Sequence, residues 1–360
     1  MLIGLRFLQG CWSVAPLTIG GKQGSRYVSV VSGSAILWKI FKAGYVLTCN
    51  ASGPLLGPTV GPIAGGFLSD ALGWRWIFWV LAAAIGILAV LALLFMRETY
   101  APVLLEGKAR RLRQETGNTN LLSKLDQGFT PKQLFYRSIV RPMKLLMTSP
   151  ICCLMSLYIA IVYGTLYVLF TTFTFVFQEK YDFTQATVGL VYLGTGIGMF
   201  AGLAFLSWTS DRTLLRLGSR HNGELKPEFR LPPLMYTAWT LPLGLFIYGW
   251  TAEYKIHWAI PLLGTAFFGA GQVLNFMVIT TYLVDTFTTY AASAVAAATV
   301  SRAVLGAVLP LVGLKMYDSI GLGWGNSLLG SVTLALCPVP YIFFAYGEKI
   351  RQNPRFQLKL

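Results

Sequence analysis

Apolar residues in this sequence gather in long runs that are separated by shorter polar segments. A helix needs about 20 apolar residues to cross the hydrocarbon core of a bilayer. Eight runs come near or exceed that length, at about 52–69, 74–96, 150–177, 187–209, 232–250, 257–283, 291–314 and 322–346, and residues 1–20 form a further apolar segment. The pattern therefore predicts an all-α membrane protein with about nine spanning helices.

One stretch breaks this pattern. Residues 22–51 mix serine and valine with four basic residues, and their apolar run at 35–49 is short and charged. Such a run is a poor candidate for a membrane span. We expect these residues to be anomalous within an otherwise regular series of helices.

The longest polar segment, residues 97–149, carries ten Lys or Arg against four acids. It predicts a partial N-terminal bundle at 1–96, a central cytoplasmic loop at 97–149, a six-helix C-terminal bundle at 150–346 and a cytoplasmic tail at 347–360. Within the loop, leucines and basic residues share a helical pattern near 104–113. This pattern fits a helix on an anionic membrane surface or a solvated linker, and both interpretations stay open.

Charge in the connecting segments predicts the orientation. Residues 97–149, 210–231 and 347–360 together carry 19 Lys or Arg, far more than the alternate connections do. Basic segments stay on the cytoplasmic side of a membrane. We therefore expect these three segments in the cytoplasm, and a multi-pass protein of the plasma membrane, with the vacuolar membrane as the alternative.

A stretch rich in glycine and proline opens the run at 52–69. Glycine stands at Gly53, Gly57, Gly61, Gly65 and Gly66, and proline at Pro54, Pro58 and Pro62. In water this composition opposes a helix, but a backbone that spans a bilayer must satisfy its own hydrogen bonds. A four-residue glycine repeat then forms a groove that a neighbouring helix can approach closely. We expect a tightly packed, flexible spanning helix.

Composition supports the membrane class. Hydrophobic residues make up 55% of the 360 residues and charged residues 12%, and the mean hydropathy is +0.59. The net charge of +15 is spread over segments between apolar runs, which the orientation rule explains and which does not indicate nucleic-acid binding.

Motifs for metal or cofactor chemistry are missing from the sequence. The five cysteines lie in apolar stretches without metal-ligand spacing, and His221 and His257 are isolated. Neither a phosphate-binding GxxxxGK[ST] loop nor an HExxH motif occurs. We therefore expect no metal, no cofactor and no enzyme activity.

Several motifs together resemble one family. "GLRFLQG" and "APLTIGG" near the start resemble the fourth helix of the major facilitator superfamily, and "GPLLGPTVGPIAGG" is similar to its fifth-helix antiporter motif. "GWRWIFWV", "RETYAPVLLEGKARRLRQETG", "YLVDTFTTYAASAVAA" and "FFAYGEKIR" resemble the fungal branch of twelve-span drug:proton antiporters. The resemblance covers about 52–360 nearly continuously and 1–21 less fully.

The resemblance implies that the spans correspond to helices four to twelve of that family, so that the chain is N-terminally truncated. Residues 22–51 depart from the family pattern, which suggests a retained intron or a mispredicted start. The glycine groove is expected to pack against the eighth family helix, around Gly189, Gly194, Gly196, Gly198 and Gly202.

Charged and aromatic residues supply the candidate site. In the family, the arginine that matches Arg6 is implicated in proton coupling, and Asp211 and Arg212 resemble a gating-loop motif, to which we add Asp285. Arg302 lies within an apolar run and needs a polar partner or a wet cavity. Tyr163, Tyr167 and Phe173 are candidates to line a drug cavity with it; simple packing or lipid contact is the alternative.

The sequence thus predicts a secondary active transporter that exports small amphipathic or cationic compounds, of multidrug or polyamine type, driven by proton entry. The alternatives are an inactive truncated fragment and a facilitator without proton coupling. The expected partners are the small-molecule substrate, the proton and the lipid bilayer, with the protein as a monomer.

Overall fold

The computed structural model describes residues 57–95, 101–118, 121, 123, 131–220 and 226–352. All regular elements among these residues are helices, which confirms the all-α prediction. Arg6, Gly53 and Pro54 lie outside the described residues, as do the apolar segment 1–20 and the anomalous stretch 22–51.

Five of the described helices are long and apolar enough to cross a membrane: Trp74–Phe95, Pro150–Tyr181, Gln185–Ser219, Ala259–Thr286 and Ala291–Gln352. The last of these contains both apolar runs predicted at 291–314 and 322–346. The run predicted at 232–250 forms two shorter helices, because regular α-helix is interrupted at Ala238 and Trp239.

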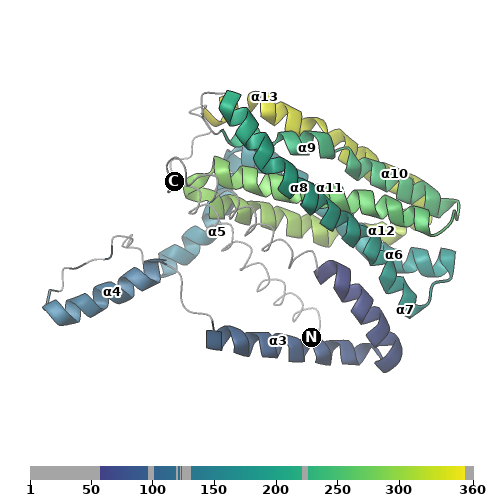
Figure 1. Cartoon of the computed structure of the whole chain (residues 1–360), viewed down its shortest axis with the longest axis horizontal. Coiled ribbons are helices and arrows are strands. Elements are labelled where there is room, and N and C mark those ends of the chain that lie inside the picture. The colour runs from purple at the N-terminus through teal and green to yellow at the C-terminus, as the bar shows by residue number, and fades with distance from the viewer. Residues whose placement is uncertain are drawn as a thin grey trace. The chain divides into compact units, whose positions relative to one another are not determined.

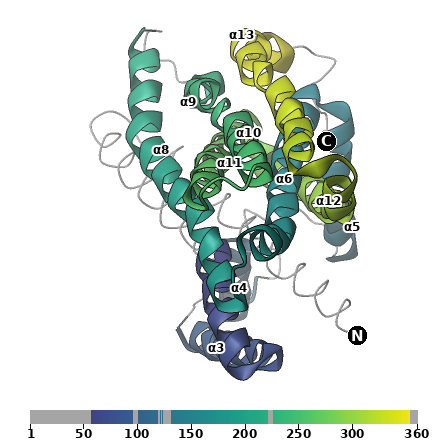
Figure 2. The ribbon, with the colours of Figure 1, turned by 90° about the vertical axis from the view of Figure 1, so that its right-hand side faces the viewer.

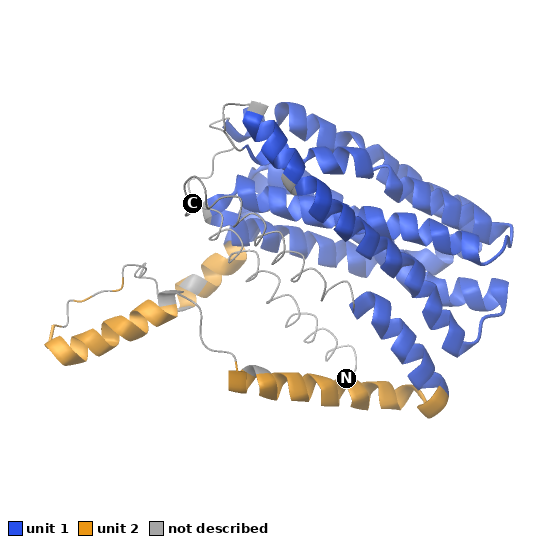
Figure 3. Ribbon diagram, in the orientation of Figure 1, with its two compact units in different colours: residues 1–70, 141–360 blue, residues 71–140 orange. Residues whose placement is uncertain are grey.

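The chain divides into two compact units, coloured separately in Figure 3. One contains residues 1–70 and 141–360, and the other residues 71–140. The four segments predicted from the long polar stretch at residues 97–149 remain a prediction.

The unit of residues 71–140 contains helix α3 (Trp74–Phe95) and helix α4 (Ala101–Thr116), and α5 (Pro131–Thr148) begins in it. α3 is apolar on all sides, as expected of a helix that faces lipid. α4 carries the basic run, and Arg113 bonds to Glu106 at 3.3 Å and to the Leu121 carbonyl at 2.6 Å.

The larger unit contains the purple helix that is described from residue 57 onward and a helical bundle, which is drawn from teal to yellow in Figures 1 and 2. Its helices are α6 (Pro150–Tyr181), α7 (Gln185–Val188), α8 (Tyr192–Arg220), α9 (Pro232–Thr237), α10 (Thr240–Glu253), α11 (Ala259–Thr286), α12 (Ala291–Leu336) and α13 (Pro338–Gln352), with 3₁₀ turns η1 (Gly189–Val191), η2 (Pro227–Arg230) and η3 (Thr288–Tyr290). α6 packs on α12, α8 on α11, and α10 on both α11 and α12.

Local chemistry sets the limits of α6. Ser149 caps its start, where the hydroxyl accepts a bond from the Cys152 N–H, and Pro150 occupies the first turn. Both features favour a helix N-terminus. The helix ends at Asp182, whose left-handed backbone (φ 56°) stops the helical hydrogen bonding.

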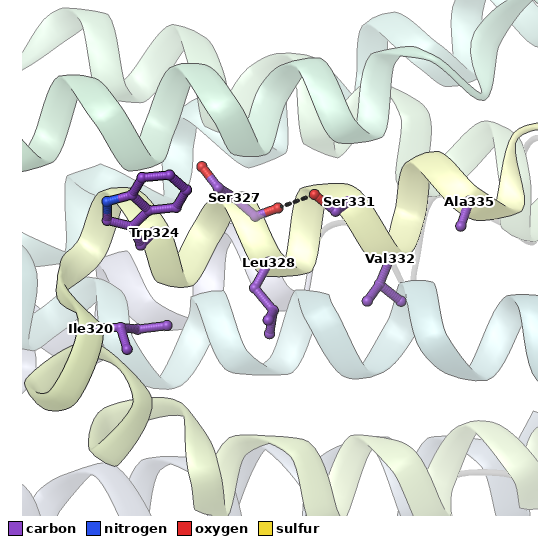
Figure 4. Close-up of a pocket in the computed structure, with 7 residues that line it drawn as sticks. All are labelled: Ile320, Trp324, Ser327, Leu328, Ser331, Val332 and Ala335. Carbon is purple, nitrogen blue, oxygen red and sulfur yellow. Dashed lines mark hydrogen bonds between the residues drawn. The ribbon is translucent and has the colours of Figure 1, made fainter.

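α12 changes direction within its length. Gly321 has φ 79° and ψ 166°, a conformation largely restricted to glycine. The ribbon turns back just after Ile320 in Figure 4. Residues 291–320 and 322–336 therefore form two helical halves, and the first contains Pro310.

Short side chains bring α8 and α11 close together. Glycines face α11 at three successive turns of α8: Gly194, Gly198 and Gly202. A Cβ atom on Gly194 would lie 2.8 Å from the Leu262 carbonyl oxygen, and one on Gly202 would lie 2.6 Å from that of Ala270. The two backbones therefore approach to a distance that only glycine permits.

The connections give the bundle two ends. α10 finishes at Glu253 and α11 starts at Ala259, so Glu253 lies at one end of the bundle. α11 runs to the other end, which contains Asp285. We call these the Glu253 end and the Asp285 end.

Candidate functional site

The glycine- and proline-rich stretch is helical over residues 57–72. Pro58 and Pro62 therefore lie inside a helix, as predicted. A Cβ atom added to Gly57, Gly61 or Gly65 would meet no atom within 4 Å. The glycine groove thus stays open among the described residues.

A different face of this helix contacts η1 and α8. A Cβ atom on Gly189 would lie 2.7 Å from the Pro62 carbonyl oxygen, and one on Gly196 would overlap the Thr59 side chain. A Cβ atom on Gly66 would lie 3.1 Å from the Gln185 carbonyl oxygen.

The expected pairing was therefore wrong in detail. Two of the five expected glycines, Gly189 and Gly196, face this helix, and Gly194, Gly198 and Gly202 pack on α11 instead. The four-residue repeat in sequence did not reveal which face of either helix is in contact.

Three of the predicted cavity residues come together, with Arg302 buried and Tyr167 exposed at 39%. The Arg302 guanidinium lies 4.4 Å from the centre of the Tyr163 ring, and that ring lies 5.1 Å from the Tyr167 ring. Phe276 of α11 lies 5.1 Å from the guanidinium. Gly306, one turn beyond Arg302, packs against the rings of Tyr163 and Tyr167. α6, α11 and α12 thus form one cluster of a cation and aromatic rings.

This cluster lies near the middle of its helices. Arg302 is about 16 Å from the start of α12, given a rise of about 1.5 Å per residue. By the same rise, Tyr163 and Phe276 lie about 20 to 25 Å from the starts of α6 and α11. A bilayer core is about 30 Å thick, so the cluster lies at membrane depth, where binding sites of secondary transporters occur.

Phe173 lies apart from this cluster. Its side chain is completely buried, and its ring packs against those of Phe170, Tyr192 and Tyr248 with centroids 5.4–6.1 Å apart. Phe173 belongs to the aromatic core between α6, α8 and α10, which is the packing alternative considered from the sequence.

Ion pairs gather at the Asp285 end. Three pairs join η2 and the residue before it to α11 and α13: Arg230–Asp285 at 2.5 Å, Glu228–Arg351 at 3.2 Å and Lys226–Glu348 at 2.9 Å. Glu228 is 3% exposed, so its charge depends on Arg351. The sequence contains one signal for this cluster: Lys226, Glu228 and Arg230 place three charges of alternating sign within five positions.

The structure describes the side chains of two of the three predicted gating residues. Asp285 pairs with Arg230, whereas the Arg212 guanidinium lies 4.7 Å above the Trp208 ring. The side chain of Asp211 lies outside the described part of the structure. Asp285 is therefore the gating candidate that the structure places in an ion-pair network.

Glu253 organises the opposite end. Its carboxylate accepts bonds from the N–H groups of Leu322 and Gly323, at 2.8 and 3.3 Å, and from Lys180 at 3.4 Å. Burial raises the pKa of this carboxyl, but the N–H groups and the ammonium outweigh burial and hold the pKa below its ordinary value. Glu253 thereby ties α6 and α10 to the turn at Gly321.

An open, apolar pocket of about 820 Å³ lies along the second half of α12. Figure 4 shows its lining: Ile320, Trp324, Ser327, Leu328, Ser331, Val332 and Ala335. The Ser331 hydroxyl donates to the Ser327 carbonyl, and the Ser327 hydroxyl accepts from the Trp250 indole. The polar groups are thus already bonded, and the pocket contains none of the predicted site residues.

No group of three or more potential metal ligands occurs within the described part of the chain. The groups present at the Arg302 cluster, a cation and aromatic rings, suit recognition by charge, stacking and shape.

The sequence matches the profile of the Major Facilitator Superfamily over residues 1–310. The chain belongs to this superfamily. Its members are transporters and not enzymes, and with the apolar helices this makes the chain an integral membrane protein.

Similar proteins come from fungi. The chain is 50% identical to the efflux pump radE of Floropilus chiversii, over 100% of this chain and 65% of that protein. It is 52% identical to the MFS-type transporter penM of Penicillium rubens, over 99% and 68%. It is 49% identical to the MFS-type transporter tndD of Aspergillus flavipes, over 98% and 64%. The chain spans about two thirds of the length of these relatives.

Proposed function

We propose that this protein acts as a secondary active transporter that exports small amphipathic organic compounds in exchange for protons. The observation that carries the proposal is the Arg302 cluster, which joins three helices at membrane depth. A central site of this kind serves alternating access, in which two bundles move about a bound substrate. The similarity to the efflux pump radE supports the direction of transport.

The ion pairs at the Asp285 end suit a gate. Pairs such as Arg230–Asp285 close one face of a bundle when they form and release it when they break. The excess of basic residues in the connecting segments supports a cytoplasmic position for this end, and we propose the plasma membrane as the location. We assign proton coupling to Arg6, in keeping with the family, and Asp211 and Arg212 to the same gating region.

The test uses a fungal cell that lacks its own efflux pumps. It compares this chain with a chimera that also carries the part of radE that this chain does not match. The measurement is retention of fluorescent amphipathic dyes, with and without a protonophore. Dye loss that the protonophore abolishes supports the proposal.

Other outcomes separate the alternatives. Dye loss that resists the protonophore indicates a facilitator, and loss with the chimera alone indicates that the chain is an inactive part of a transporter. Retention unchanged with both proteins across acidic, neutral and cationic dyes contradicts the proposal.

A further inference from the structure

Arg302 is a buried cation that contacts aromatic rings and has no acidic partner. The residue is 8% exposed, and its guanidinium lies against Tyr163 and Phe276. Within the described part of the chain it forms no ion pair. A charge at membrane depth costs about 2.5–3.5 kcal/mol on insertion scales. A buried charge of this kind needs a counter-charge.

Among the described residues, no carboxylate forms an ion pair with Arg302. Residues 1–56 contain no Asp or Glu. Three acids lie on the helices of the cluster: Glu179 on α6, Asp285 on α11 and Asp318 on α12. Each lies about 14 to 24 Å along its helix from the cluster residue on that helix. Glu253 of α10 is engaged with Lys180 and the turn at Gly321. The described part of the chain therefore leaves the counter-charge of Arg302 to another group.

The cluster leaves room for such a group. It is open on the side of Tyr167, which is 39% exposed, while Arg302 is 8% exposed. The rings of Tyr163 and Phe276 lie over the guanidinium, whereas its N–H groups are directed along its edges. These edges match a carboxylate, which accepts two parallel bonds from a guanidinium.

A second polar group supports this interpretation. Gln272 lies one helical turn before Phe276 on α11 and is 4% exposed. Its side-chain oxygen is buried without a hydrogen-bond partner. A buried, unpartnered amide oxygen accepts a hydrogen bond from a hydroxyl group of a ligand or from water, and Gln272 lies on the face of α11 that carries Phe276.

We propose that Arg302 binds the acidic group of the exported compound, a carboxylate or phenolate, while Tyr163 and Phe276 contact its aromatic or apolar skeleton. This proposal rests on the proposed export function and defines its substrate class as organic acids. It disfavours the cationic compounds that the sequence suggested, because a cation would be repelled by Arg302.

The test measures binding rather than transport. Purified full-length chain in lipid nanodiscs is titrated with fluorescein, an anionic dye, and rhodamine 123, a cationic dye of similar size and ring system. Fluorescence anisotropy reports binding, with empty nanodiscs subtracted. The variants are Arg302→Gln and Arg302→Lys. Arg75→Gln is the matched control, because Arg75 also lies over an aromatic ring, at 4.8 Å from Trp74, but is exposed.

Wild type and R75Q should bind fluorescein more tightly than rhodamine 123. R302Q should weaken fluorescein binding by about tenfold or more without weakening rhodamine binding, and R302K should be intermediate because it retains the charge without the planar fork. Melting of R302Q at or above the wild-type temperature shows that the loss is not unfolding. If R302Q does not fold, the fluorescein affinity of R302K relative to wild type tests the proposal by itself.

Equal affinity of wild type for both dyes, or unchanged fluorescein binding in the variants, overturns the proposal. The same dyes in the efflux assay separate the two conclusions. If binding depends on Arg302 but neither the chain nor the chimera exports dye, the proposed export function is contradicted and the anion site is not. If both dyes are exported and R302Q leaves this export unchanged, the anion site is contradicted and the export function is not.

Discussion

Arg230 and Asp285 form an ion pair in which the guanidinium Nε donates to the carboxylate at 2.5 Å, joining η2 to the end of α11. The two side chains are 15% and 28% exposed. A hydrogen bond between charged groups contributes about 1.5–3 kcal/mol, and partial burial reduces screening by salt. The pair therefore stabilises the Asp285 end.

Replacing Asp285 by Asn should lower the free energy of unfolding by about 2 kcal/mol, because Arg230 is left without its counter-charge. Arg230→Gln should have a similar effect, and the double variant should lose less than the sum. Thermal unfolding in detergent measures these values.

The control is Arg110→Gln. Arg110 pairs with Glu106 but is 74% exposed, and Glu106 keeps its contact with Arg113 in this variant. The loss should therefore change stability by less than about 1 kcal/mol. Equal losses for Arg110→Gln and Asp285→Asn would show that the partly buried pair has no special role.

Glu253 should make stability depend on acid pH. Its pKa is lowered in the folded protein, so its contribution is present above the unfolded value of about 4.3 and disappears as pH falls through the folded value. Glu253→Gln should therefore be less stable than wild type at pH 7, and this difference should shrink below about pH 4.3. Melting temperatures of both proteins across this range test the prediction, which a pH-independent difference would contradict.

Gly198→Ala should destabilise the protein strongly. The added methyl group would overlap the Ala266 carbonyl oxygen and force α8 away from α11. Overpacking of this kind costs about 1–3 kcal/mol or more. Gly61→Ala is the matched control, since its methyl group would meet no atom within 4 Å. Unfolding in detergent should separate the two, and equal stability of both variants would refute the close helix contact.

Gly321→Ala should cost about 1–3 kcal/mol, because alanine disfavours the backbone that Gly321 adopts, with φ 79° and ψ 166°. The same change at Gly86, inside α3 and without neighbours within 4 Å, should stabilise the helix by up to about 1 kcal/mol. Chemical unfolding compares the two variants. An equally mild effect at Gly321 would mean that the turn relaxes to another conformation.

The sequence predicted the helices well because length and apolarity decide whether a segment spans a bilayer. It also identified Arg302, since a charge within an apolar run requires explanation wherever that helix lies. Phe276 was missed because its role depends on how α11 and α12 face each other, which periodicity within one helix does not contain. The same reason explains why Phe173 was grouped with Tyr163 and Tyr167, although it belongs to the core.

Glu253 was missed for a different reason. An acid at the end of a span has the same appearance in sequence as any solvated loop residue, and its importance arises from two backbone N–H groups about 70 positions away. The glycine repeat indicated that two helices pack closely, but it did not show which face of the helix makes the contact. Small residues lie on more than one face of this helix, so the spacing alone does not distinguish the faces.

Pro310 has a mechanical consequence for the Arg302 cluster. A proline inside a helix removes the bond to the carbonyl four residues earlier, and here that carbonyl belongs to Gly306, which packs on the rings of Tyr163 and Tyr167. Both ends of the bundle are held by charged contacts. Pro310 therefore places a compliant point of α12 beside the aromatic pair, so a ligand that presses on those rings would bend the helix at a weakened turn.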